Sequence, residues 1–449
     1  MAETSASKLS KRIHTDGSTH YKSATAPANP VEGDLWYDTS AGALKSYNGT
    51  EFLKVSASIP TLSSISGDIT TGASSSLTLA GTKFLTSNLV VNFVQSSDAI
   101  DVDVTVTPTN DSAATVTVPS SVYDNVTAGN AVTIKVTNSD GATSNTVDKT
   151  VIQGPYSVDF LVIAGGAGGG YSLDGYQSGG GGGAGGYRAS YNNETSGGGG
   201  SSESSLSFTP STVYTITVGA GGTGGNGGSP TASTDGSASS ISGSDITNIT
   251  TVGGGRGGNA GNDGPNQVAN DGGSGGGAQY YNSQQNSPGA GTANQGFAGG
   301  TSSANGAGNG AGGGGGAGAV GGNGGSSSAG SGGNGVASTI TGSSVTRAGG
   351  GGAGRTETYV TGGTGGTGGG GNGALRDTSA STDGTTNTGS GGGGGILNTY
   401  LDGSNGGSGV VILRMLASGY SGTTTGSPTV ADDGSYKVLT FTGDGSYTA

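Results

Sequence analysis

Residues 361–371 read Thr-Gly-Gly-Thr-Gly-Gly-Thr-Gly-Gly-Gly-Gly, and similar glycine runs recur throughout residues 164–409. These runs supply most of the 102 glycines in the 449-residue chain. A glycine inside a helix or strand is destabilising by about 0.5–1 kcal/mol relative to alanine, so such runs do not form conventional elements. Either this region is a flexible coil, or it packs in a way that only glycine permits.

Three features favour the ordered alternative. The region is bracketed by short apolar runs at 159–164 and 409–416, which are typical of buried strands and are well placed to pair. Inside it, residues 213–218 alternate Tyr214, Ile216 and Val218 with threonines, as a half-buried strand does. The inserts between the glycine runs also carry tyrosine, arginine, asparagine and glutamine, which a flexible linker does not need.

Glycine runs that tolerate a small residue at every third position match the polyproline II helix, which has three residues per turn and a rise of about 3.1 Å per residue. This helix has no internal hydrogen bonds, so its backbone groups must find partners on neighbouring helices. Glycine allows the backbones to approach closely enough for those bonds. We therefore predict a slab of packed glycine helices with the inserts as loops at its two ends.

Four stretches follow one another in a fixed order in this region. They are Phe160-Leu-Val-Ile-Ala-Gly-Gly, Gly181-Gly-Gly-Ala-Gly-Gly-Tyr187, Tyr214-Thr-Ile-Thr-Val-Gly-Ala-Gly-Gly222 and Gly406-Gly-Ser-Gly-Val-Val-Ile-Leu-Arg414. In this order they resemble the glycine-rich domain of bacteriophage tail fibres and adhesins, and the resemblance covers about residues 158–416.

Residues 33–55 are predicted to form a small antiparallel meander, with strands at 35–37, 44–47 and 52–55 and a type I′ turn at Asn48-Gly49. A sheet this small is marginally stable alone, so we expect it to lean on a partner chain or another part of a particle. Core packing accounts best for its aromatic residues. The stretch also resembles a short module common near the ends of phage tail-fibre chains.

Residues 59–152 show short strands rich in Val, Ile and Thr separated by turn residues, which is the pattern of a β-sandwich. Its opening Ile59-Pro-Thr-Leu-Ser-Ser-Ile-Ser-Gly-Asp68 and closing Val132-Thr-Ile-Lys-Val-Thr-Asn-Ser-Asp-Gly141 resemble an IPT/TIG immunoglobulin-like domain. Asp98, Asp101 and Asp103 are compatible with a calcium site, but the alternation favours one solvent-facing strand edge for Asp101 and Asp103.

The predicted fold is therefore an all-β N-terminal half, a small meander plus an immunoglobulin-like β-sandwich, followed by packed polyglycine II helices framed by β-strands, with almost no α-helix. The expected divisions are a polar attachment segment at 1–30, the meander at 31–57, the sandwich at 58–153, the glycine-rich domain at 156–418 and a C-terminal β-hairpin at 427–449.

The composition of the chain limits the classes of function that we expect for it. The chain has no cysteine, a net charge of −13 and a pI near 4.4, which argue against thiol chemistry and a nucleic-acid partner. No apolar stretch is long enough to cross a membrane, and residues 1–30 lack the apolar core of a secretory signal. Both histidines, His14 and His20, lie in the polar N-terminal segment, and carboxylates are sparse among the glycine runs. We expect neither enzyme activity nor a cofactor or metal.

The inserts between glycine runs are the candidate binding surface, because tyrosine, asparagine and arginine on a rigid scaffold form an adaptable recognition surface. Alternatively, their tyrosines cap the ends of the helix bundle. Recognition is favoured for the densest insert, residues 280–285. The candidate receptor-binding residues are Tyr171, Tyr176, Tyr187, Arg188, Tyr191, Tyr280, Tyr281, Asn282, Gln284, Gln285, Arg355, Tyr359 and Tyr400.

The resemblance implies a virion protein made in the host cytoplasm, a tail fibre or tip adhesin. Its N-terminal part would attach to other tail or capsid proteins, and its loops would bind a host receptor, either a glycan or an outer-membrane protein. A purely structural role as a head fibre, decoration or connecting tail protein is the main alternative, and a bacterial surface adhesin is a third. A homotrimer is implied by the fibre resemblance alone, since the sequence has no heptad or collagen repeat.

Overall fold

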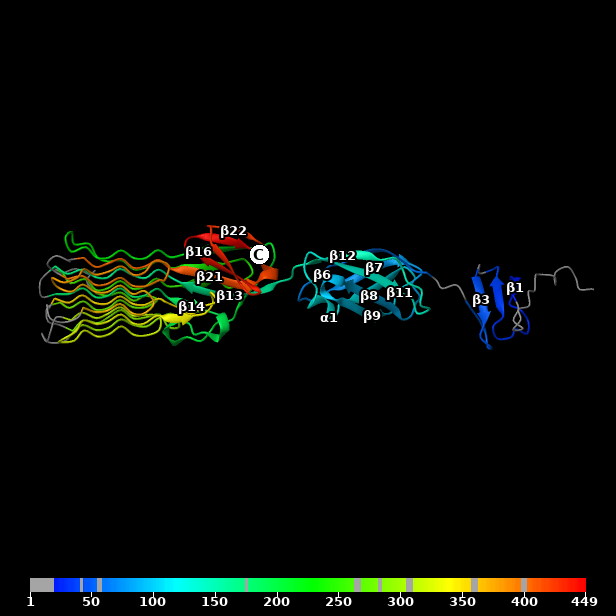
Figure 1. Cartoon of the computed structure of the whole chain (residues 1–449), viewed down its shortest axis with the longest axis horizontal. Coiled ribbons are helices and arrows are strands. Elements are labelled where there is room, and N and C mark those ends of the chain that lie inside the picture. The colour runs from blue at the N-terminus through cyan, green and yellow to red at the C-terminus, as the bar shows by residue number, and fades with distance from the viewer. Residues whose placement is uncertain are drawn as a thin grey trace, which may run out of the picture. The chain divides into compact units, whose positions relative to one another are not determined.

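The computed structural model describes residues 20–40, 43–54, 59–173, 177–261, 268–281, 285–303, 310–356, 362–396 and 402–449 (Figure 1). The chain divides into two compact units, Met1–Gly154 and Pro155–Ala449. In the described residues, strands and extended glycine runs dominate, and the α-helical content is one short helix, α1 (Ser120–Tyr123). The predicted all-β fold with almost no α-helix is confirmed.

The first sheet of the N-terminal unit is the predicted meander with one strand added. Trp36 is its buried centre: the indole packs edge-on against Phe52 with ring centroids 5.2 Å apart, and its Nε1 donates to the Ser23 carbonyl at 3.1 Å. The strands, in sheet order, are β1 (His20–Ser23), β2 (Leu35–Asp38), β3 (Ala43–Tyr47) and β4 (Phe52–Lys54).

Strand β1 lies in the segment that was predicted to be only a polar attachment region. It pairs in parallel with β2, opposite residues 35–38. Its sequence, His-Tyr-Lys-Ser, has no apolar alternation from which a strand could be recognised. The acceptors that Ser23 offers to the Trp36 indole help to hold it there.

The turn after β3 differs in type from the prediction. Tyr47 pairs with Phe52, so the loop has four residues and is not the two-residue type I′ turn expected at Asn48-Gly49. The Asn48 side chain closes the loop by accepting hydrogen bonds from the amides of Thr50 and Glu51, both at 2.9 Å. An Asn-Gly pair predicts a turn here, but the side-chain bonds favour the longer loop.

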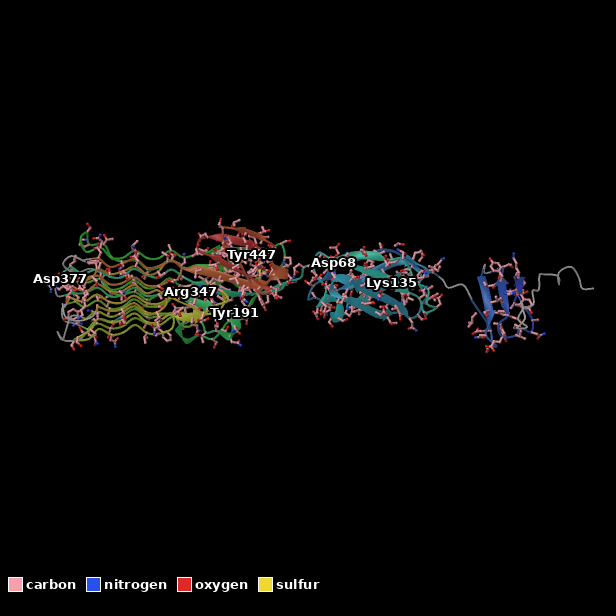
Figure 2. All side chains as sticks on the ribbon, in the orientation of Figure 1. Asp68, Lys135, Tyr191, Arg347, Asp377 and Tyr447 are labelled. Atoms are coloured by element: carbon pink, nitrogen blue, oxygen red, sulfur yellow. The ribbon has the colours of Figure 1, made fainter. Side chains whose placement is uncertain are left out.

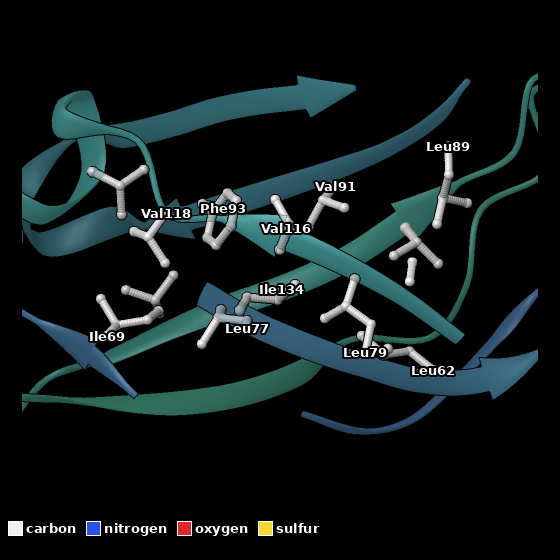
Figure 3. Close-up of a cluster of buried hydrophobic side chains, with 14 of the residues drawn as sticks. Leu62, Ile69, Leu77, Leu79, Leu89, Val91, Phe93, Val116, Val118 and Ile134 are labelled. Carbon is white, nitrogen blue, oxygen red and sulfur yellow. The ribbon is translucent and has the colours of Figure 1, made fainter. Parts of the chain in front are cut away.

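Two sheets face each other in the rest of this unit, as the sandwich prediction requires. One has the order β10-β7-β5 and the other β6-β12-β11-β8-β9, and fully buried side chains from both, such as Leu79 and Phe93, form a single core (Figure 3). The strands are β5 (Thr61–Ser66), β6 (Ile69–Thr70), β7 (Ser76–Thr82), β8 (Leu89–Gln95), β9 (Ile100–Val106), β10 (Ala113–Thr117), β11 (Ala131–Thr137) and β12 (Val147–Ile152).

The glycine-rich region of the C-terminal unit is bracketed by two strands that pair with each other, as predicted. β13 (Tyr156–Ile163) runs antiparallel to β21 (Val410–Leu416), with Phe160 opposite Leu413. Both faces of β13 are buried, because Phe160 packs toward a second sheet and Leu161 packs toward the bases of the glycine runs. The sheet has the order β14-β13-β21-β24-β23, with β15 also on β13; the added strands are β14 (Tyr187–Ala189), β15 (Leu206–Phe208), β23 (Thr429–Asp433) and β24 (Tyr436–Phe441).

The second sheet of this unit contains the predicted strand at 213–218, with Tyr214 and Ile216 buried on one face. The C-terminal hairpin prediction is confirmed for β23 and β24, and the chain then continues into a further strand of this second sheet. The sheet has the order β18-β17-β16-β25-β22, formed by β16 (Val213–Thr217), β17 (Ser239–Ser242), β18 (Ile249–Thr251), β22 (Thr423–Thr425) and β25 (Gly445–Thr448); β19 (Val336–Ser338) and β20 (Val345–Arg347) form a separate pair.

The glycine runs extend from these strands as a bundle of segments that lie side by side (Figure 1). Their backbone hydrogen bonds are lateral and have a period of three. The amides of residues 181 and 184 donate to the run 312–315, those of 182 and 185 to 389–392, and those of 183 and 186 to 252–255, with distances of 2.8–3.1 Å. Three residues per turn is the geometry of the polyglycine II helix.

The run 179–186 is surrounded by other runs. The carbonyl oxygens of Gly181, Gly182 and Gly183 accept hydrogen bonds from residues 277, 351 and 167, which belong to three runs other than those that receive its own donors. A methyl group built on Gly182 would lie 2.2 Å from the Ala167 carbonyl oxygen. Glycine is therefore required by the spacing of the backbones, as the sequence predicted.

Candidate functional site

The inserts between glycine runs are divided between the two ends of the bundle. We call the end away from the strands the apex and the end at β13, β14 and β21 the base. At the apex, short bridges join inserts that lie far apart in the sequence: Ser172 pairs with Ala260, Ser178 with Tyr280, and Arg355 with Leu375. Asp377 marks the apex in Figure 2, whereas Tyr191 and Arg347 lie at the base.

Arg355 is an anchor of the apex and is fully buried. Its Nη2 donates to the Ser326 carbonyl oxygen at 3.0 Å and its Nη1 to that of Gly325 at 3.3 Å. A buried guanidinium needs such acceptors, because an unbonded charged group is costly to remove from water. Arg355 therefore fixes the turn at 325–326 against the end of its own run.

Two of the candidate tyrosines at the apex are also buried. Tyr280 is 3% exposed and packs against Ala311 and Ala353. Tyr171 is 4% exposed, and Gly225 and Gly261 lie close to its ring. These rings cover the ends of the glycine helices, where a run of glycine offers no side chain of its own.

Among the described residues, few of the candidates face solvent at the apex. Among the described residues of the densest insert, Gln285 is exposed and Tyr281 is half-buried. Asp377 also lies at the apex, where its Oδ2 is 3.7 Å from Arg376 Nε, and both side chains are partly exposed. Neither residue was a candidate from the sequence. Tyr176, Asn282, Gln284, Tyr359 and Tyr400 lie outside the described residues.

Tyr187, Arg188 and Tyr191 lie at the base and not at the apex. Tyr187 is fully buried within the core that joins β13 to the glycine runs, and burial, reinforced by the nearby Glu194 carboxylate, raises the pKa of its phenol. Burial also lowers the pKa of the neighbouring Arg347 guanidinium. The ring of Tyr187 is thus a core group in this chain.

Tyr191 belongs to a cation–π cluster around Arg414. The Arg414 guanidinium lies 5.0 Å from the Tyr191 ring and 4.4 Å from the Tyr436 ring, and it pairs with Asp433 at 2.7 Å. Its Nη1 also donates to the Ile340 carbonyl oxygen at 3.1 Å. Arg414 on β21 thereby ties the C-terminal hairpin to the base of the glycine runs.

Arg188 projects from β14 beside Glu203, and their side chains form a two-pronged ion pair. Its Nε donates to Glu203 Oε1 at 2.7 Å and its Nη2 to Oε2 at 2.6 Å. A pocket of about 540 Å³ opens at this pair and includes Asn294 in its lining. Arg188 was a candidate from the sequence, whereas Glu203 and Asn294 were not. The pocket joins segments about ninety residues apart, and the order in which the glycine runs pack cannot be predicted from the sequence.

Side chains that could ligate a metal ion are scattered in the parts of the chain that the structure describes. No three His, Cys, Asp or Glu side chains there come close enough together to hold a metal ion. Asp101 and Asp103 are exposed on β9, where both accept hydrogen bonds from the Asn92 amide. The described residues also contain no helix with the length and apolar composition of a membrane span.

Comparison with known proteins places this architecture in a family. Residues 141–416 match the model of the glycine-rich domain family, so more than half of the chain is covered. The chain belongs to this glycine-rich domain family. No curated protein and no solved structure matches the chain.

Proposed function

We propose that the chain is a bacteriophage tail fibre or tail-tip adhesin that displays loops from its glycine-rich scaffold to a host-cell surface receptor. The observation that carries the proposal is the convergence of inserts at the apex, where Ser172, Ser178, Tyr280, Arg355 and Leu375 connect separate parts of the sequence. A rigid scaffold that gathers inserts of different sequence at one end is suited to recognition, because the scaffold fixes the points at which the inserts begin and end.

The remaining parts of the proposal follow the same resemblance. The N-terminal unit attaches the chain to other tail or capsid proteins, and its sandwich is an IPT/TIG-like spacer. The receptor is a glycan or an outer-membrane protein, and the chain works as a homotrimer in the virion. The net charge of −13 agrees with a surface that does not bind nucleic acid.

The test is binding of the labelled full chain to cells of candidate hosts. We expect saturable binding that is lost when residues 281–285 are replaced by Gly and Ser, and weakened by Tyr281→Ala combined with Gln285→Ala. A matched control replaces Ser343 and Ser344, which are exposed in the turn between β19 and β20 at the base, with glycine. Equal loss in the control and the apical variant would contradict recognition by the apex.

The structural alternative also has a specific observation in its favour. Tyr171, Tyr280 and Arg355 are buried as end caps, which is what a spacer needs to keep water from the ends of its glycine helices. A head fibre, decoration or connecting tail protein of this kind binds no host cell but is captured stoichiometrically by another virion protein. Absence of cell binding together with such capture would favour this role.

A further inference from the structure

The pocket at the base of the bundle has two walls that come from different parts of the sequence. One wall is the segment that follows β14, and the other is the turn at 293–295 between two glycine runs. Arg188 and Glu203 lie at one side of it. The lining residues are Arg188, Ser196, Ser201, Ser202, Glu203, Ala293, Asn294 and Gln295.

The two walls are held together by backbone contacts that leave little room for movement. The Gln295 carbonyl oxygen accepts a hydrogen bond from the Tyr187 amide at 3.0 Å. A methyl group on Gly197 would lie 2.0 Å from the same oxygen, and one on Gly200 would lie 2.9 Å from the Asn294 side chain. The pocket is therefore formed before any ligand arrives, which reduces the entropy cost of binding.

The Arg188–Glu203 pair offers both donors and acceptors to a ligand. Besides its two bonds to Glu203, Arg188 donates from Nη1 to the Thr250 carbonyl oxygen at 3.1 Å. A guanidinium has five N–H donors, so these three bonds leave two for another partner. The side chains of Arg188 and Glu203 are 24% and 27% exposed, so solvent or a ligand reaches both.

The rest of the lining adds small polar groups. Ser201 and Asn294 are exposed, and Asn294 has a positive φ of 60°, which directs the turn at this wall. Ser202 also lines the pocket, and its hydroxyl oxygen has no hydrogen-bond partner among the described residues. Ser196 is already engaged with the Ala189 amide at 3.1 Å.

We propose that this pocket binds a neutral saccharide. Arg188 and Glu203 cancel each other's charge. The carboxylate repels an anionic ligand, and the guanidinium repels a cationic one. A sugar hydroxyl both donates and accepts, so neighbouring hydroxyls can accept from Arg188 and donate to Glu203 at once. A volume of about 540 Å³ is within the range of small-molecule sites, about 300–1,000 Å³.

This site is separate from the apex and does not rest on the proposed adhesin function. Arg188 lies on β14 at the base (Figure 1), whereas Asp377 marks the apex at the far end of the glycine runs (Figure 2). Free sugars also test the pocket without any host cell. Failure of cell binding and failure of sugar binding are therefore independent results.

The experiment titrates the full chain with neutral hexoses, N-acetylhexosamines and their disaccharides, followed by calorimetry and ligand-detected NMR. Sialic acid and a sugar phosphate serve as charged comparisons. We expect saturable binding of at least one neutral sugar with a dissociation constant on the order of 1 mM. Ser201→Trp, which fills the pocket but keeps the ion pair, should weaken that binding by about tenfold or more.

Matched variants distinguish sugar binding in this pocket from sugar binding elsewhere on the chain. Ser343→Trp places the same side chain on an exposed turn of the base and should leave sugar binding unchanged, as should Arg376→Ala at the apex. Arg188→Ala should abolish binding while the protein stays folded by circular dichroism. The proposal is overturned if no neutral sugar binds, if Ser201→Trp binds as well as the unchanged chain, if a charged sugar binds more tightly, or if Arg376→Ala removes the binding.

Discussion

The sandwich of the N-terminal unit and the glycine bundle of the C-terminal unit exclude water by opposite means. In the sandwich, Leu77, Leu79 and Phe93 fill a core between two sheets, and burial of apolar side chains stabilises it. In the bundle, buried positions such as Gly182 have no side chain, and lateral backbone hydrogen bonds join each run to its neighbours. The first region needs side chains of the right volume, and the second needs their absence.

The largest expected effect comes from adding a side chain inside the bundle. In Gly182→Val the new Cβ would lie about 2.2 Å from the Ala167 carbonyl oxygen, and that oxygen is backbone and cannot move aside alone. We expect the bundle to lose more than about 4 kcal/mol of its free energy of unfolding, or not to form. Calorimetry is the suitable measurement, because the single tryptophan, Trp36, reports on the meander.

The matched control for this variant is Gly443→Ala. A Cβ at Gly443 meets nothing within 4 Å, and its φ is not in the left-handed region. Its expected change is within about 0.5 kcal/mol. Equal effects of the two substitutions would mean that the runs are not in close backbone contact.

The next largest effect is expected in the sandwich, from removal of a buried side chain. Phe93→Ala removes a fully buried ring from the sandwich core and should cost about 3–5 kcal/mol there. The calorimetric transition of the C-terminal unit should keep its temperature, because Met1–Gly154 and Pro155–Ala449 are separate compact units. Thr105→Ala, at an exposed position of β9, is the control. An equal shift of both transitions would contradict independent stabilisation.

A smaller effect is expected where side chains do matter in the C-terminal unit. Arg414→Met removes the ion pair with Asp433 and the contacts with the Tyr191 and Tyr436 rings, and should cost about 1–3 kcal/mol. Asp433 is partly exposed and returns to water, so the cost is below that of a fully buried carboxylate. The control is Lys437→Met, which removes the more exposed ion pair with Asp432. It should change the free energy of unfolding, measured with a chemical denaturant, by less than about 1 kcal/mol. The same loss in both variants would argue against the cluster.

The smallest expected effect is a pH dependence of the C-terminal unit. Burial, with a hydrogen bond to Asp245, raises the pKa of Tyr214 to about 12, and burial next to Tyr447 also raises that of Tyr156. A raised folded-state pKa means that this stability is complete below pH 10, the ordinary tyrosine value, and is lost as the pH rises toward 12. The melting temperature should fall across that window, and less steeply in Tyr214→Phe. A constant melting temperature would contradict these shifts.

The sequence predicted the frame of the fold because apolar and alternating residues carry positional information. The pairing of 159–164 with 409–416 followed from two apolar runs, and the strand at 213–218 followed from alternation. The order of the glycine runs could not be predicted, because one glycine run resembles another. Strand β1 was not predicted, because its sequence, His-Tyr-Lys-Ser, has no alternation of apolar and polar residues.

The candidate site was predictable in composition but not in placement. The residues named as binding candidates do lie in inserts, yet Arg355 and Tyr280 are buried at the apex, and Tyr187 is buried at the base. Burial depends on which run lies beside each insert. The contact of Gly200 with Asn294, which closes the pocket at the base, depends on the run order in the same way.

The most direct test of the packed bundle is hydrogen exchange of the glycine amides in the full chain. The amides of Gly181, Gly182 and Gly183 donate to carbonyls of three different runs at 2.9–3.1 Å, inside the bundle. We predict that they exchange orders of magnitude more slowly than unstructured glycine, at rates comparable to those of β13 and β21. Exchange of these amides at the unprotected rate, while the sandwich strands stay protected, would show that the runs are a flexible coil and contradict the packed bundle.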